Sequence, residues 1–105
     1  MNPELILAAL NYTPQEAYDI ASGKEKRCPD LEPIIATVPE LAYYYAINIF
    51  KGRWPEAETV IATSPSWAFI YAINIIKGRW PEGESAIVTD PWYKEQYEKE
   101  FKVKL

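Results

Sequence analysis

A chain of 105 residues has room for one domain, and its 49% hydrophobic and 25% charged residues are ordinary for a folded protein. Its net charge of −4 argues against binding nucleic acid through phosphates, so we expect no nucleic acid duplex as a partner. Histidine, the commonest general base and metal ligand, is absent, and a single cysteine, Cys28, excludes an internal disulfide.

The two longest apolar stretches, Leu41–Phe50 and Trp67–Ile76, are both interrupted by an asparagine. Each is far shorter than the roughly 20 apolar residues that cross a membrane. The first residues, MNPELILAAL, lack the basic start and the cleavage pattern of a signal peptide. We therefore expect a cytoplasmic protein that makes no contact with a membrane.

Eight of the nine prolines follow a spacing of about 26 residues. Proline is favoured at the first position of a helix, where its missing N–H has no partner within the helix. One series contains Pro3, Pro29, Pro55 and Pro81, and the other contains Pro39, Pro65 and Pro91, with Pro14 displaced by one residue. The prolines predict eight helices, at about 3–11, 14–22, 29–37, 39–51, 55–62, 65–77, 81–88 and 91–102.

Residues beside the prolines support these helix boundaries. Thr13, Ser64 and Asp90 precede prolines and are good N-caps, and TPQE, which begins at Thr13, has the spacing of a capping box. Gly52 and Gly78 follow the two apolar helices. Because glycine adopts the left-handed backbone conformation without strain, we expect both to end these helices with a positive φ.

The middle of the chain is an internal repeat. When residues 38–63 are aligned with residues 64–89, 16 of the 26 positions are identical, and they include two copies each of KGRWPE and YAINI. Paired helices that recur at a fixed period, each too small to bury its apolar face alone, predict an all-α fold. We expect one domain over residues 1–105, a short α-solenoid of about four two-helix repeats whose eight helices alternate short and long.

The repeat resembles a class of short helical repeats that carry KGR[WF]PE[AG]E with YA before it and occur in uncharacterised phage and bacterial proteins. The resemblance covers residues 38–93 well and residues 3–37 weakly, where KEKRCPDLE lacks the glycine and the tryptophan. It implies a helical repeat fold and a viral origin, hence the host cytoplasm as location. It carries no catalytic residues.

The long helices are apolar on nearly every side and must be covered by something. Four helix pairs are too thin to hide both faces, so an exposed patch indicates a partner surface or self-association. Residues that vary between the repeats more often face outward. The predicted partner-binding residues are Leu41, Tyr43, Tyr44, Trp67, Phe69 and Ile70. They favour a repeat protein that binds another protein with a basic surface. If the chain is viral, we expect it to inhibit a host defence or regulatory protein. The same patch also predicts a homo-oligomer.

The pairs Arg53–Trp54 and Arg79–Trp80 recur one unit apart. One interpretation is a stacking ladder for a small-molecule ligand such as a nucleotide signal. The favoured interpretation is that the indole rings fill the space between units, while the arginines pair with Glu56, Glu58 or their repeats.

Asn48 and Asn74 interrupt the apolar helices at the same position of the repeat. Because a buried amide must be hydrogen-bonded, we expect them to link units by bonding to loop carbonyls. The alternative is that both amides face a groove and hold the backbone of a ligand.

The carboxylate pairs of the repeat lie in the first turns of helices, where the helix dipole favours acids. No nucleophile–base pair, phosphate-binding loop or metal-ligand spacing accompanies them. We therefore expect no enzyme, no cofactor and no metal.

Overall fold

The computed structural model describes residues 11–105, and in that range the chain forms seven α-helices and no strand. The predicted all-α class is confirmed. The predicted helix 3–11 lies, except for its last residue, outside the described range. The α-helices are α2 (Pro14–Lys24), α3 (Glu32–Ile35), α4 (Pro39–Tyr45), α5 (Pro55–Ile61), α6 (Pro65–Tyr71), α7 (Pro81–Ile87) and α8 (Pro91–Phe101), and α4 and α6 continue into the π-helical turns η1 (Ala46–Phe50) and η2 (Ala72–Ile76).

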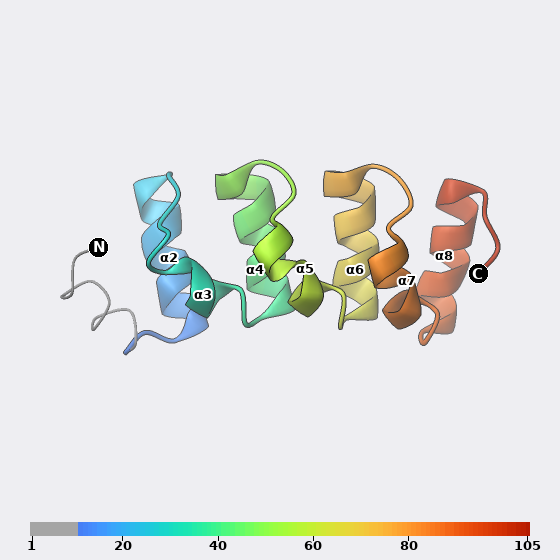
Figure 1. Cartoon of the computed structure of the whole chain (residues 1–105), viewed down its shortest axis with the longest axis horizontal. Helices are drawn as coiled ribbons and strands as arrows, with labels where there is room; N and C mark the ends of the chain where they lie inside the picture. Colours follow the sequence, from blue (N-terminus) through green and yellow to red (C-terminus); the bar gives the residue numbers. More distant parts are fainter. Residues whose placement is uncertain (1–10) are drawn as a thin grey trace.

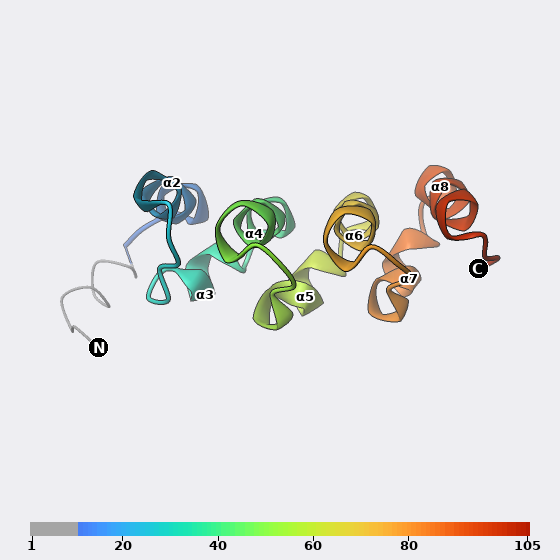
Figure 2. The same cartoon turned by 90° about the horizontal axis from the view of Figure 1, so that it is seen from above.

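The helices form two parallel rows in an elongated molecule of 49 × 21 × 18 Å (Figure 1). The long helices α2, α4, α6 and α8 stand side by side in one row, and the short helices α3, α5 and α7 form the other (Figure 2). Each short helix packs against the long helix before it and the long helix after it. Neighbouring helices therefore repeat the same contacts along the molecule.

The predicted helix starts are confirmed at most positions. Proline occupies the first turn of every described α-helix, and the capping box at Thr13 and Glu16 is present in full. The exception is the helix predicted at 29–37, of which only α3 and a preceding turn form. Pro33, the proline outside both series, has no N–H to donate to an earlier carbonyl and so interrupts this segment.

The prediction for Gly52 and Gly78 is wrong, because neither glycine has a positive φ. The left-handed residue is the preceding lysine, with φ of 61° at Lys51 and 59° at Lys77. The cause is the π-helical turn. The N–H of Lys77 donates to the carbonyl of Ala72, five residues back, at 2.7 Å, and the N–H of Gly78 donates to the same oxygen at 3.3 Å.

The π-helical turns also account for the displaced Pro14. The left-handed residues Glu25, Lys51 and Lys77 keep the 26-residue spacing. Helix α2 contains no π-helical turn and therefore needs one residue fewer between its proline and its left-handed end than α4 does. The start of α2 shifts by one residue while its end remains in register.

The core lies between the two rows and uses the same repeat positions along the molecule. Its largest fully buried side chains recur at intervals of 26 residues and are Tyr45, Tyr71, Tyr97, Trp54, Trp80, Ile35, Ile61 and Ile87. Cys28 takes the position of the two tryptophans in the first described repeat, and the residue three positions later changes with it, from Leu31 to Ala57 to Gly83. The large Leu31 thus accompanies the small Cys28, whereas the small Ala57 and Gly83 accompany the two tryptophans.

Gly83→Ala is expected to destabilise the protein by about 1–3 kcal/mol, because an added Cβ would lie 2.5 Å from Cε3 of the buried Trp80 ring. Helix propensity alone predicts the opposite sign, by about 1 kcal/mol. Denaturant unfolding measures the difference.

The matched control is Gly78→Ala, where an added Cβ meets nothing within 4 Å and φ is not positive. Its free energy of unfolding should remain within about 0.5 kcal/mol of the original protein. A Gly83→Ala protein as stable as this control would contradict the packing of Trp80.

Candidate binding surfaces

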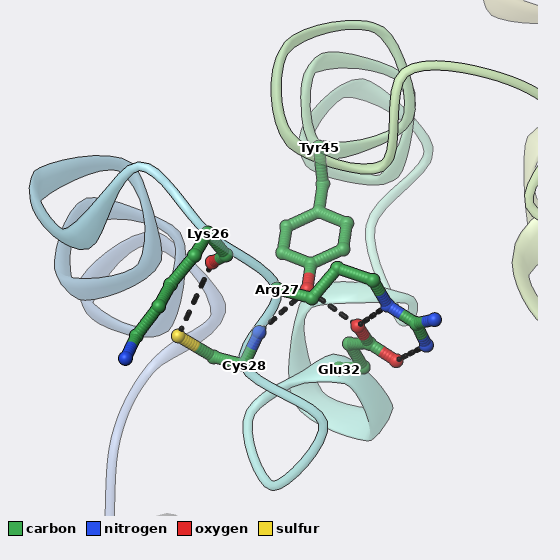
Figure 3. Close-up of polar contacts among 5 residues, drawn as sticks. All are labelled: Lys26, Arg27, Cys28, Glu32 and Tyr45. Carbon is green, nitrogen blue, oxygen red and sulfur yellow. Dashed lines mark hydrogen bonds and ion pairs between the residues drawn. The ribbon is translucent and has the colours of Figure 1, made fainter.

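A polar cluster joins each short helix to the long helix that follows it. In the first copy, the Tyr45 hydroxyl accepts a hydrogen bond from the backbone N–H of Cys28 at 3.0 Å and donates one to the carboxylate of Glu32 (Figure 3). Arg27 donates two hydrogen bonds to the same carboxylate, each of 3.1 Å. The tyrosine thus connects a loop backbone and a short helix to α4.

The same cluster recurs twice at a spacing of 26 residues. Its members are Arg53, Trp54, Glu58 and Tyr71 in the second copy and Arg79, Trp80, Glu84 and Tyr97 in the third. The tyrosine hydroxyls donate to the glutamates at 2.7 and 2.6 Å and accept from the backbone N–H groups of Trp54 and Trp80 at 2.9 and 2.8 Å. Of the glutamates predicted as partners for Arg53, namely Glu56, Glu58 and their repeats, Glu58 is the one it pairs with. The tyrosines complete each cluster, and Tyr45 and Tyr71 are the first residues of the repeated YAINI.

These contacts change the acidity of the groups that make them. Partial burial alone would raise the pKa of Glu58, but the hydrogen bonds from Arg53 and Tyr71 outweigh it and hold that pKa below its ordinary value of 4.5. Burial and the hydrogen bond to Glu58 raise the pKa of Tyr71 above its ordinary value of 10.0. The glutamate is therefore ionised and the tyrosine neutral near pH 7, as the hydrogen bond between them requires.

The two tryptophans of the KGRWPE motifs are internal. Trp54 and Trp80 are each 1% exposed, with ring centroids 4.7 Å from Tyr45 and 4.8 Å from Tyr71 respectively. The interpretation that the indoles fill space between units is confirmed. Because the rings turn no face to solvent, they offer no stacking surface to a nucleotide, and the half-exposed Arg53 is already paired with a carboxylate.

Asn48 and Asn74 are exposed and link neighbouring long helices. Asn48 donates to the hydroxyl of Tyr18 at 3.3 Å, and Asn74 donates to that of Tyr43 at 3.0 Å. The expected link between units is present, but its acceptors are tyrosine hydroxyls rather than loop carbonyls. Tyr18 and Tyr43 are each the fifth residue of their helices. The one-residue displacement of α2 therefore leaves both acceptors at the same helix position, although Asn48 lies 30 residues after its acceptor and Asn74 lies 31 residues after its own.

The residues predicted to bind a partner divide into three groups. Leu41 and Tyr43 are buried, so the expectation that they face outward is wrong. Trp67, Phe69 and Ile70 are partly buried. Tyr44, 38% exposed, is the one with an open side chain. The reason is contact between the long helices, which covers most of the variable positions.

Aromatic side chains nevertheless continue along the row of long helices. The ring of Trp67 lies 5.5 Å from that of Tyr43 and 5.6 Å from that of Tyr44, joining α4 to α6. Phe69 lies 5.7 Å from Tyr93 on α8, which contacts the 57% exposed Trp92. We call these rings the aromatic band. Its members are the buried Tyr43, the partly buried Trp67, Phe69 and Tyr93, and the exposed Tyr44 and Trp92. Trp92 was not among the residues predicted to bind a partner.

Within residues 11–105, no cluster of histidine, cysteine, aspartate or glutamate could hold a metal ion, and no helix is long and apolar enough to cross a membrane. These features define an all-helical protein whose neighbouring helices make repeat-like contacts. The chain matches no protein-family model, and neither a curated protein nor a solved structure shows significant similarity to it.

Tyr71→Phe should lower the free energy of unfolding by about 1–3 kcal/mol. The change leaves the buried backbone N–H of Trp54 without its acceptor and removes a hydrogen-bond donor to Glu58. The lowered pKa of Glu58 means that its contribution to stability is present above about pH 4.5 and is lost as the pH falls through the folded-state value. The variant should therefore also lose less stability on acidification than the original protein does.

Denaturant unfolding between pH 3 and pH 7 tests both effects. The control is Tyr44→Phe, which removes a hydroxyl from an exposed side chain. If Tyr71→Phe and Tyr44→Phe gave the same stability and the same pH profile, the cluster would not hold the helices together.

Trp80→Ala should cost about 3–5 kcal/mol, because it empties a fully buried position between units. Arg79→Ala should cost at most about 1 kcal/mol, because the guanidinium is half exposed and its ion pair is screened by solvent. Chemical denaturation of the two variants compares them directly, and a stable Trp80→Ala protein would refute the structural role of the motif.

Proposed function

We propose that this chain is a short α-solenoid of four two-helix repeats that binds another protein and catalyses no reaction. Three copies of the Arg–Glu–Tyr cluster at one spacing support the solenoid, since each copy connects successive units in the same way. Arrays of this kind present extended surfaces whose rigidity comes from the contacts between repeats.

The observation that carries the proposal is the aromatic band. Trp92 is 57% exposed and Tyr44 is 38% exposed, whereas the tryptophans between the units are buried. Tryptophan and tyrosine contribute most to the binding energy of protein interfaces because they bury a large area at low cost in conformational entropy. Exposed aromatic residues on a rigid row of helices therefore favour a protein partner.

The chemistry of the partner follows from charge. The chain carries a net charge of −4, so a basic surface on the partner would increase the rate of association. The resemblance to repeats in phage and bacterial proteins suggests a host defence or regulatory protein in the host cytoplasm as that partner. Self-association through the same band is the competing use of this surface.

The double variant Tyr44→Lys, Trp92→Lys should bind the partner at least tenfold more weakly, about 1.4 kcal/mol, while its unfolding free energy remains unchanged. Binding is measured by affinity capture from a bacterial lysate and then by calorimetry with the purified partner. The control is Val88→Lys, which changes a residue of similar exposure, 39%, at the end of the short helix α7.

Equal binding by the double variant and the control would exclude the aromatic band as the interface. Light scattering separately measures the oligomeric state of the original chain and of the double variant. A dimer of the original chain that the double variant dissociates would assign the band to self-association instead.

A further inference from the structure

The row of short helices carries a second surface, made of two equivalent hollows. One, of about 450 Å³, lies between α3 and α5, and the other, of about 420 Å³, lies between α5 and α7. Glu32, Ala36 and Glu56 line the first, and Glu58, Ala62 and Glu82, each 26 residues later, line the second. The repeat therefore builds the same concave site twice.

The hollows exist because the short helices pack on the long helices and make few close contacts with one another. Alanine lies at the same place in both hollows, as Ala36 in the first and Ala62 in the second. The clusters of Tyr45 and Tyr71 hold the walls, so the shape does not depend on a ligand.

Each hollow has an excess of negative charge. One of its two glutamates is neutralised by an arginine, Glu32 by Arg27 and Glu58 by Arg53. The other, Glu56 or Glu82, is exposed and makes no hydrogen bond or ion pair with another described side chain, although Glu82 lies near enough to Arg53 to contribute to its raised pKa. No lysine or arginine is among the described residues that line the hollows.

We propose that the two hollows bind an extended basic segment of a protein, with one lysine side chain in each. The aliphatic stem of each lysine would lie on the alanine, and its ammonium group would pair with Glu56 or Glu82. This surface is on the row opposite the aromatic band, so the inference goes beyond the proposed function and stands independently of it.

The distance between units sets the spacing of the two lysines. Neighbouring packed helices lie about 8–10 Å apart, and this sets the separation of equivalent points in successive units. A polyproline II segment has three residues per turn and rises about 3.1 Å per residue, so side chains three residues apart point the same way at about 9 Å. The segment that fits carries lysines at positions i and i+3 between prolines.

The test uses a fluorescein-labelled peptide, PPKPPKPP, and measures its binding by fluorescence anisotropy. The original protein should bind it, and the double variant Glu56→Gln, Glu82→Gln should bind it about tenfold more weakly. The matched control, Glu40→Gln, Glu100→Gln, removes the same charge from exposed residues of the long helices and should bind within about twofold of the original. A second peptide of the same composition, PPKKPPPP, cannot fill both hollows and should bind more weakly.

Three results would overturn the inference. The first is no binding of PPKPPKPP at about 1 mM, the weak limit of measurable affinity. The second is an equal loss in the two charge variants, which would mean general attraction to an acidic protein. The third is equal affinity for the two peptides, which would mean that the paired hollows do not act together.

Discussion

The structure depends on one interaction that occurs three times in residues 11–105, in which a tyrosine hydroxyl donates to a glutamate and accepts from a backbone N–H of the preceding loop. A backbone N–H that is buried without an acceptor costs about 1–3 kcal/mol, so each hydroxyl is required where it lies. Because the tyrosine comes from the next long helix, every cluster ties one unit to its neighbour. The arginine completes the cluster by neutralising the glutamate from the solvent side.

The interior of the molecule repeats from unit to unit, whereas its two surfaces, the aromatic band and the row of hollows, differ in chemistry. The repeated aromatic residues Trp54, Trp80, Tyr45, Tyr71 and Tyr97 are fully buried by packing between the rows. The exposed side chains include the aromatic Tyr44 and Trp92 on the long helices and the acidic Glu56 and Glu82 on the short helices. A rigid array can present both at once, because contacts between its units set its shape.

Much of the fold could be predicted because its signals are local. Proline and the capping residues Thr13, Ser64 and Asp90 act within one turn of a helix, so the helix starts follow from neighbouring residues. The burial of Trp54 was also predicted, as was a carboxylate partner for Arg53 among Glu56, Glu58 and their repeats, since a motif that serves as a linker must pack with the elements it joins. The exposed residues of the binding surfaces were harder to predict than the helix starts. Which aromatic residue stays open depends on the neighbouring helix, and so Tyr43 is covered while Tyr44 is not.

The sequence by itself determined the helical class, the 26-residue period and where most helices begin, because these depend on interactions within a few residues. Only the tertiary structure decided how the long helices end and what they expose. The π-helical turns assign the left-handed conformation to Lys51 and Lys77 instead of to the glycines that follow. The hollows beside Ala36 and Ala62 arise from the spacing between units. That spacing is a property of packed side chains from several helices, which no local pattern encodes.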